Sequence, residues 1–475
     1  MVVSKKFSRR PAVTAVAILL PLWLAGCAAP EVTPEHEIEA TAPQAWSAAM
    51  PDSTVVSAAE FWSQWNDPTL LTLIARVEER SPKVESALAT LRAARASIQS
   101  ANAALWPSAT ASAKAQRTRA AGESTNTYQG TLGGSWDINL AGATYARYDA
   151  ALYAARAQAW ALESVKDQMI AEVATAYINW RAAQEKAALI AKTLASYEET
   201  AKLAQWKADS GLGAVSDAET AMVQVKNAQV SLHSAEQSIA EYRNAIARLT
   251  ALPNDQLPVP PAGTIPTTKT GLAQSIPAAV MMQRPDIRSA IESLYGAAKS
   301  VQAAKADFFP MLSLSGSIGT QAATVSALGA SGTGVGALAA ALSMPILNWG
   351  SLAAAEEQAS ANLDQAKATY RETLVEALEE TDNALWAVKT TEASQPAVTQ
   401  AVEHAQKAWQ LAKLQYESGL GDYTQLLTAE RDYWSAQESE INNRASMSNA
   451  YVTLYRVLGG AWQTRVNPSL GTPLK

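Results

Sequence analysis

The sequence predicts a mainly α-helical protein made of two tandem copies of one unit, each with two membrane β-strands and a very long helical hairpin. Residues 210–213 (Ser-Gly-Leu-Gly) interrupt a long alanine-rich helical pattern, and residues 418–421 repeat the interruption 208 positions later (419 − 211). Pro82 and Pro285 each begin a helix, 203 positions apart (285 − 82). After both of these helices the pattern changes from a helical period to a period of two, which is typical of strands.

The N-terminal segment has the pattern of an export signal. A basic start, an apolar run over residues 12–22 and Leu-Ala-Gly-Cys at 24–27 follow one another, and the run is too short for an ordinary spanning helix. This resembles a bacterial lipoprotein signal, so we expect cleavage between Gly26 and Cys27 and a lipid such as palmitate on Cys27. No aspartate follows at position 28, which by the same resemblance implies the outer membrane. Cys27 is the only cysteine, so the chain can form no internal disulfide.

The segment after the signal predicts an arm and then a helix. Residues 27–60 are rich in Pro, Ala and acidic residues without a helical period, which indicates an extended arm. The aromatic residues Phe61, Trp62 and Trp65 follow and are placed to hold it. Asp67-Pro68 then predicts the start of a short helix that ends near Arg80.

Strands are predicted at residues 108–118 and 131–140 in the first copy, and at 311–320 and 336–346 in the second. Each pair is joined by a loop rich in Gly, Ser and Thr. A half-buried hairpin of a soluble protein is one interpretation. Strands of about ten residues with aromatics near their ends favour a membrane barrel instead. Four strands cannot close a barrel, because known barrels begin at about eight, and an open edge is not tolerated in lipid. Three identical chains would supply twelve strands.

The long helices are predicted to start at Gly142 and Gly350 and to fold back at the two Ser-Gly-Leu-Gly tips. Glycine just past a helix end accepts the left-handed conformation of a C-cap. Apolar residues recur every three or four positions along the first long helix and are expected to pack inside its hairpin: Leu162, Val165, Met169, Val173, Ala176 and Trp180.

The predicted divisions follow from these patterns. They are a signal peptide at 1–26, a lipidated arm at 27–60, a first repeat at 61–270 with its tip at 209–213, a second repeat at 271–462 with its tip at 417–421, and a C-terminal tail at 463–475.

Composition excludes several functions. The net charge is −6 and no basic stripe is present, which argues against nucleic acid as a partner. The sequence has no nucleotide-binding Gly-x-x-x-x-Gly-Lys-Ser/Thr loop, no nucleophile motif and only three isolated histidines. We therefore expect no enzymatic activity, no metal site and no cofactor apart from the lipid on Cys27.

The order helix, strand, strand, long helix, tip and helix, repeated behind a lipoprotein signal, resembles the TolC-like outer-membrane efflux channel family. The lipoprotein branch associated with resistance-nodulation-division pumps (OprM-like) is the nearest resemblance. The most specific motifs are Trp62 with Asp67-Pro68, the Gln-Arg-Pro-Asp-Ile run at 283–287, and the tip regions 203–229 and 411–437.

This resemblance implies a homotrimer with a twelve-stranded β-barrel in the outer membrane that continues into a long periplasmic α-helical barrel. The channel is passive and conducts small amphiphilic compounds delivered by an inner-membrane pump. A periplasmic adaptor (membrane fusion) protein would dock on the tips, here Ser210, Gly211, Leu212, Gly213, Ser418, Gly419, Leu420 and Gly421.

Family members close the periplasmic end with polar contacts and acidic rings. Asp217 matches a recurring family aspartate, whereas its counterpart in the second repeat is Gln425, which puts a strong cation-binding ring in doubt. Asp209, Asp422 and Tyr423 are further gate candidates, and a solvated surface role is the alternative for each.

Two other functions fit the sequence. A type I protein-secretion channel would share the fold, and a non-conducting lipidated periplasmic scaffold would need the helices but not the strands. The four alternating strands therefore distinguish a channel from a scaffold. The sequence indicates neither the transported compounds nor the particular adaptor and pump.

Overall fold

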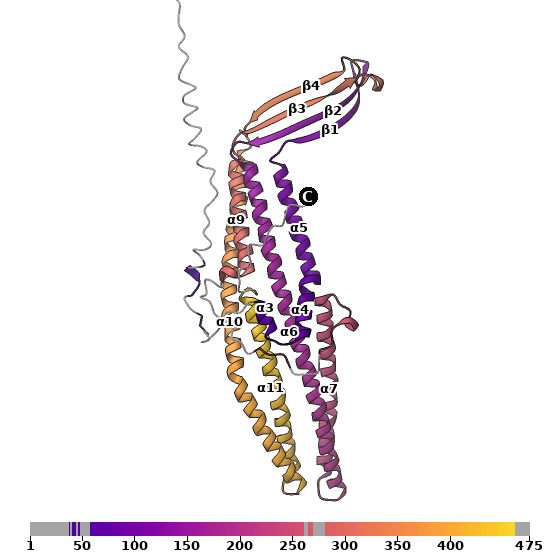
Figure 1. Ribbon diagram of the computed structural model, residues 1–475, viewed down its shortest axis with the longest axis vertical. Coiled ribbons are helices and arrows are strands. Elements are labelled where there is room, and N and C mark those ends of the chain that lie inside the picture. Colours follow the sequence, from indigo (N-terminus) through magenta and orange to yellow (C-terminus); the bar gives the residue numbers. More distant parts are fainter. Residues whose placement is uncertain are drawn as a thin grey trace, which may run out of the picture.

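The computed structural model describes residues 38, 40–43, 46–47, 58–260, 265–268 and 281–460. A four-stranded sheet lies at one end of the molecule and two long helical hairpins end together at the other (Figure 1). The elements are α3 (Ala58–Ser63), α4 (Pro68–Arg80), α5 (Pro82–Ala103), β1 (Ser108–Ala120), β2 (Glu123–Asn139), α6 (Ala143–Asp209), α7 (Val215–Thr250), η2 (Asn254–Gln256), α9 (Pro285–Ala306), β3 (Met311–Ala322), η3 (Val325–Ala327), β4 (Gly334–Ser343), α10 (Trp349–Glu417) and α11 (Tyr423–Val457).

The predicted duplication is visible in the order of elements. The series α5, β1, β2, α6, α7 is repeated as α9, β3, β4, α10, α11. The matching helices α5 and α9 both begin with proline and have 22 residues each. The long helices α6 and α10 have 67 and 69 residues, about 100 Å at ~1.5 Å per residue. Pro396 lies inside α10, which continues through it although the ring removes one backbone donor.

The four strands form one antiparallel sheet in the order β1-β2-β3-β4. The central pair, β2 with β3, joins the two repeats, with Trp136 opposite Leu314. The outer strands β1 and β4 each have one edge without a partner among the described residues. Both repeats therefore contribute strands to one sheet, and this sheet does not close into a barrel within one chain.

The strand boundaries differ from those predicted, most of all at the start of β2. β2 starts at Glu123 and not near 131, and a two-residue turn replaces the expected loop of the first repeat. The two turn residues, Ala121 and Gly122, have φ of 51° and 87°, and positive φ at both positions belongs to a tight hairpin turn. The polar residues 123–130 resembled a loop in composition, but their partners across the ladder make them strand. In the second repeat β3 extends to Ala322, and β4 is shifted to Gly334–Ser343.

The apolar stripe predicted in the first long helix is confirmed as core. Leu162, Met169, Val173, Ala176 and Trp180 are buried, and Val165 packs against them. In α10 the polar Thr381 is fully buried among Leu374, Ala377, Leu385 and Val388 of the same core, and its hydroxyl donates to the Ala377 carbonyl at 2.7 Å. The buried hydroxyl is thus satisfied within its own helix.

The N-terminal motif, Trp62 with Asp67-Pro68, packs against the middle of the long helices. Asp67 caps α4 by accepting from the Thr69 N–H at 2.9 Å, and its other oxygen accepts from the Tyr177 hydroxyl at 2.7 Å. Phe61 stacks on Tyr455 with ring centroids 4.9 Å apart. The short helices therefore attach to α6 and α11 through a buried aromatic cluster.

Arg284, in the second motif, joins three helices. Its guanidinium donates to Asp286 at 2.6 Å, to Glu380 at 2.9 Å and to the Val457 carbonyl at 3.1 Å. Burial alone would lower the pKa of Arg284, but the two carboxylates outweigh it and raise the pKa. The arginine stays charged and ties α9 to α10 and α11.

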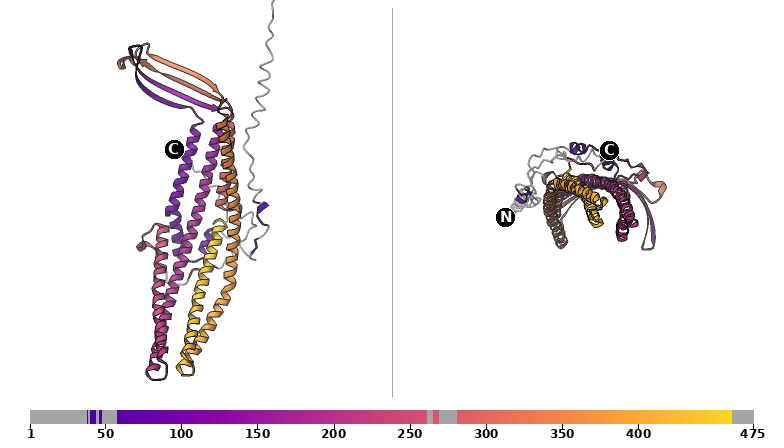
Figure 2. Two further views of the ribbon diagram at one scale, coloured as in Figure 1. Left: turned by 180° about the vertical axis from the view of Figure 1, so that it is seen from behind. Right: turned by 90° about the horizontal axis from the view of Figure 1, so that it is seen from below.

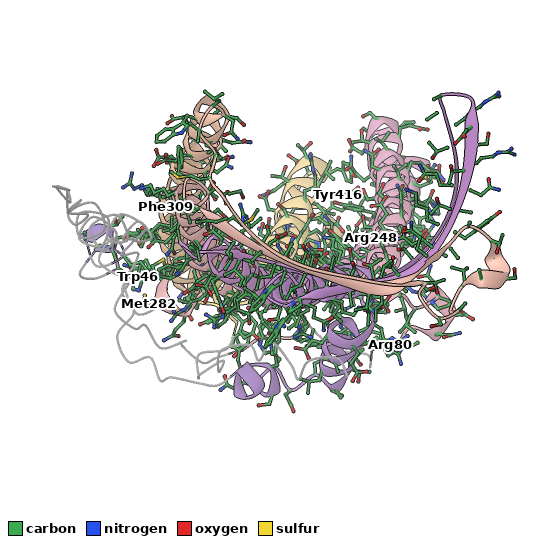
Figure 3. The ribbon with its side chains drawn as sticks, turned by 90° about the horizontal axis from the view of Figure 1, so that it is seen from above. Trp46, Arg80, Arg248, Met282, Phe309 and Tyr416 are labelled. Carbon is green, nitrogen blue, oxygen red and sulfur yellow. The ribbon has the colours of Figure 1, made fainter. Side chains whose placement is uncertain are left out.

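Seen along the long axis, the helices and the sheet follow one arc (Figure 2). From the sheet end, Arg80 of α4 lies on the convex side of this arc (Figure 3). In the part of the chain that the structure describes, no helix combines the length and the apolar composition needed to cross a membrane.

Candidate functional site at the two helical tips

The two tips have the same backbone turn. Gly211 has a φ of 70°, and the next N–H donates to the Lys207 carbonyl at 2.8 Å. Gly419 has a φ of 75°, and the next N–H donates to the Gln415 carbonyl, also at 2.8 Å. This is a Schellman motif, in which a left-handed residue follows the helix end. The left-handed C-cap predicted from the sequence is confirmed at both tips.

The second glycine of each tip allows a close approach of the chain to the preceding helix. A Cβ at Gly213 would lie 3.1 Å from the Cβ of Lys207, and one at Gly421 would lie 3.1 Å from the Cβ of Gln415. Each glycine of the two Gly-x-Gly turns is therefore explained by the structure. The first adopts a positive φ, and the second leaves room for the preceding helix, which a side chain would crowd.

The tips present large apolar side chains to solvent. Leu212 is 80% exposed and Leu420 is 85% exposed, although leucine is more often buried. Further exposed apolar residues flank them: Trp206, Val215, Leu411 and Leu414. A grouped apolar surface at the end of a protein is typical of a contact surface for another protein.

The two hairpins contact each other just above their tips. The Lys207 ammonium of the first hairpin lies 4.0 Å from the centre of the Tyr416 ring of the second, and it also donates to the Tyr416 carbonyl. A cation near the last carbonyls of a helix is favourable because those carbonyls carry partial negative charge. Farther along, Lys413 pairs with Glu199 at 3.1 Å. Hydrogen bonds and ion pairs thus connect the hairpins at more than one level.

Glu430 is a carboxylate buried between the hairpins. Its side chain is fully buried and accepts from the hydroxyls of Ser196 and Thr200, which lie on α6. Burial raises the pKa of Glu430, and the hydroxyl bonds and the charge of Lys413 only partly offset this. Tyr423 packs nearby against Tyr416, with ring centroids 6.0 Å apart.

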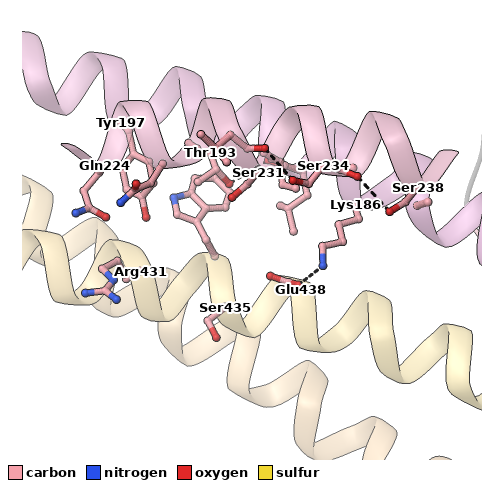
Figure 4. A pocket seen from close by; sticks show the side chains of 18 residues that line it. Lys186, Thr193, Tyr197, Gln224, Ser231, Ser234, Ser238, Arg431, Ser435 and Glu438 are labelled. Carbon is pink, nitrogen blue, oxygen red and sulfur yellow. Dashed lines mark hydrogen bonds and ion pairs between the residues drawn. The ribbon is translucent and has the colours of Figure 1, made fainter. Parts of the chain in front are cut away.

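A cavity of about 610 Å³ separates α6 and α7 from α11 on the sheet side of this contact. Figure 4 shows the ion pair between Lys186 and Glu438 crossing it, with a row of serines on α7: Ser231, Ser234 and Ser238. The hairpins are therefore less tightly packed here than at the tips.

The five gate candidates occupy different environments. Asp209 is exposed and accepts from the Gln205 amide at 2.8 Å. Asp217 is half-buried in the first turn of α7, and its charge, after burial, helps to raise the pKa of Tyr416. Asp422 caps α11 by accepting from the backbone N–H of Gln425, an exposed residue, at 2.8 Å.

Tyr423 packs within the chain. The side chain is 4% exposed and belongs to the contact between the hairpins, so the alternative of a solvated surface role does not apply to it. Burial raises its pKa, with smaller contributions from Glu430 and neighbouring tyrosines.

Sequence analysis missed Lys207 and Glu430. A signal for Glu430 is present, because Tyr423, Leu426, Glu430 and Tyr433 follow one another at helical spacing and place the carboxylate in an apolar stripe. For Lys207 the sequence offers no such signal, since its partner is a backbone carbonyl 209 positions away.

The predicted cleavage and lipidation site is not among the residues that the structure describes. Gly26 and Cys27 fall outside the described residues, as do the predicted signal peptide and the C-terminal tail. Within the described ranges, no three His, Cys, Asp or Glu side chains gather in a way that could hold a metal ion.

An open antiparallel sheet placed on a long helical shaft, with two matched tips at the far end, defines the class of outer-membrane channel proteins with a helical extension. Comparison with known families agrees: a profile described as "Outer membrane efflux protein" matches residues 73–252 and 277–460. These ranges are the two repeats, and the chain belongs to this family.

Named relatives are similar over nearly the whole chain. The toluene efflux pump outer membrane protein TtgC of Pseudomonas putida is 31% identical, with 93% of this chain and 94% of TtgC covered. The antibiotic efflux pump outer membrane protein ArpC of Pseudomonas putida is 31% identical, with the same coverage.

Solved structures share the fold. The outer-membrane channel OprN superposes with a TM-score of 0.84 at 27% identity, covering 92% of this chain and 100% of OprN. The open state of the Neisseria gonorrhoeae channel MtrE gives 0.80 at 26% identity, covering 91% and 98%. The protein is thus an outer-membrane efflux channel component, and its helices form the periplasmic extension.

Proposed function

We propose that three copies of this chain form a passive export channel for small amphiphilic compounds. One observation carries the proposal: among the described residues β1 and β4 are edge strands without partners, yet β1, β2 and β3 alternate apolar and polar residues as a membrane barrel requires. Pairing of β1 with β4 of the next copy removes every edge. Twelve strands then surround a bore that continues between the helices.

The tips are the proposed docking surface for a periplasmic adaptor and the inner-membrane pump behind it. Their exposed leucines support this role, since a partner that covers them removes apolar surface from water. The names of TtgC and ArpC refer to toluene and to antibiotics, which supports small amphiphilic compounds as cargo. Family members are channels, and we propose no catalytic activity here.

Two finer features belong to the same proposal. A lipid on Cys27 would anchor each copy to the membrane by its mature N-terminus. Asp209, Asp217, Asp422 and Gln425 would form the polar constriction near the tips, because all four lie within the last turns around them.

Disulfide cross-linking of the sheet edges tests the closure. In a Cys27→Ser background, Ser112→Cys on β1 is combined in turn with Val335→Cys, Ala337→Cys or Ala339→Cys on β4, which share its face of the sheet. We expect oxidation to yield covalent trimers for at least one combination.

The matched control joins strands inside one chain. Gly133 and Ser317 lie opposite each other on β2 and β3, so Gly133→Cys with Ser317→Cys gives only an intrachain disulfide. If that control forms while no edge combination links two chains, closure by identical copies is ruled out.

A further inference from the structure

The sheet has one apolar face, defined by the register of its strands. Residues opposite each other on neighbouring strands point to the same side. One side carries the alanines at 109, 111, 113 and 115 of β1 together with the large apolar residues Leu132, Trp136, Ile138, Leu312, Leu314, Ile318, Leu338 and Leu342. We call this side the lipid face, since the outward surface of a membrane barrel is apolar.

The opposite face is polar and hydrogen-bonded on β1, β2 and β3, whereas on β4 it carries Val335, Ala337, Ala339 and Ala341. Ser112 and Thr131 hydroxyls are 2.9 Å apart, and Ser313 donates to Asp137 at 2.6 Å. This face is the one that lines the water-filled bore in the proposed channel.

Two aromatic residues mark the borders of the lipid face. Trp136 lies at the helical end, where its indole N–H donates to the Leu105 carbonyl at 3.0 Å. Tyr128 lies at the far end, opposite Ala115 and Ala322. The eight positions between them (136 − 128) span about 27 Å along the strand at ~3.4 Å per residue. This is close to the apolar band of ~25 Å that aromatic girdles enclose in membrane barrels.

Two arginines follow immediately beyond the far border on the lipid face. Arg117 lies opposite Asn126 and Arg119 opposite Ser124. Arg117 is one same-face step beyond Ala115 and Tyr128, about 7 Å at ~3.4 Å per residue. Both side chains are exposed, and the β1-β2 hairpin here extends past the last pair of β2 with β3.

Neither arginine has an ion-pair partner among the described residues. The nearest acid along the hairpin, Glu123, is opposite Ala120 and points to the other face. Two unpaired guanidinium groups therefore stand on the membrane side, at the level where the apolar band ends and the lipid headgroups begin.

We propose that Arg117 and Arg119, with Tyr128 beneath them, form a binding site for the phosphate groups of outer-leaflet lipid. A guanidinium offers paired donors that match the oxygens of a phosphate, and Tyr128 lies where the lipid chains meet the headgroups. The site rests on the proposed membrane barrel. It holds a lipid against the outside of the hairpin, and is separate from the bore and from the tips.

Native mass spectrometry of the full chain in an uncharged detergent, titrated with lipid A as the bisphosphorylated probe, tests the site. We expect Arg117→Gln and Arg119→Gln each to weaken lipid A binding about five-fold, and the double variant to weaken it more. Lys114→Gln removes the same charge from the bore face of the same strand, and is expected to leave binding unchanged. Arg117→Lys is expected to bind at an intermediate level, because it keeps the charge and loses the paired donors.

Three results with the variants would overturn the proposal. The first is lipid A binding by the double variant that equals that of the wild type. The second is a loss of lipid A binding in Lys114→Gln as large as in the arginine variants. The third is loss of the assembled mass in the arginine variants, which would assign the arginines to a contact between copies. Dephosphorylated lipid A is expected to bind the wild type and the double variant equally. Displacement of lipid A by an equal concentration of inorganic phosphate would show that the site takes free phosphate and not lipid.

Discussion

Gly211 and Gly419 are the residues on which the tip geometry most directly depends. Their φ values of 70° and 75° strain any β-branched residue, and the left-handed conformation costs about 1–2 kcal/mol for a residue with a Cβ. Gly211→Val or Gly419→Val is expected to distort one tip and weaken cross-linking to the adaptor in native membranes, while the assembled channel stays intact.

Gly350→Val is the matched control for this prediction. The same substitution is made at a glycine in the first turn of α10, where a side chain meets nothing and φ is not positive. Adaptor cross-linking as strong in the tip variants as in Gly350→Val would contradict a docking role for the turn.

Glu430 gives the contact between the hairpins a pH dependence. Burial raises its pKa above the usual 4.5, so the folded chain takes up this proton more readily than the unfolded chain. The contact is therefore most stable below the usual pKa, and this stability is lost as the pH rises through the raised value.

Glu430→Gln is expected to remove this dependence. Thermal unfolding of the purified protein, followed from about pH 5 to about pH 8, should show less loss of stability with rising pH than the wild type. Glu198→Gln, an exposed carboxylate on α6, serves as the control and should keep the wild-type slope. A Glu430→Gln profile parallel to the wild type would contradict the account.

Residues of the site differ in how far sequence could predict them. The tip glycines were predictable because a left-handed C-cap is a local property of four residues. Glu430 and Lys207 were not recognised, because each is defined by a partner on the other hairpin, more than two hundred positions away. The burial of Tyr423 was not predictable either, since nearness to the tip does not distinguish a buried from an exposed side chain.

At the scale of elements, the helices followed the sequence closely and the strands less so. α4 runs from Pro68 to Arg80 as predicted, because its capping residue and proline are unambiguous. β2 starts earlier than predicted, because its first residues are polar on both faces and only pairing with β1 defines them as strand. Composition alone does not contain that information.

Among the described glycines of the sheet, Gly319 has the least space for a side chain. A Cβ there would lie 2.2 Å from the Gly130 carbonyl oxygen, closer than side-chain carbons approach, whereas a Cβ at Gly130 meets nothing within 4 Å. Gly319→Ala is therefore expected to separate β2 from β3 and lower the thermal stability of the detergent-purified protein. Gly130→Ala is the matched control, and an equal melting temperature for the two variants would contradict the register between the repeats.

At the scale of the whole molecule, the sheet and the lipid are independent means of holding the chain in the membrane. Cys27→Ser is expected to abolish incorporation of labelled palmitate while the protein still inserts, because the strands are unchanged. The measurement is radioactivity in the purified protein together with its fractionation. Label retained on the serine variant would refute Cys27 as the acylated residue.

At this scale, the part of the architecture that the sequence predicted is the part that follows from the internal repeat. The duplication fixed the order of elements in both halves, and the family profile matches the same two halves. The arc in which the helices lie was not predictable in this way, since it results from many contacts between distant helices and not from any one motif.

The mass of the mature protein, purified in detergent and measured by light scattering with the detergent subtracted, tests the central claim most directly. An open four-stranded sheet with an apolar face needs copies of itself, so we predict three times the mass of one mature chain and precipitation when the detergent is removed. A monodisperse single chain that stays in solution without detergent would contradict the channel.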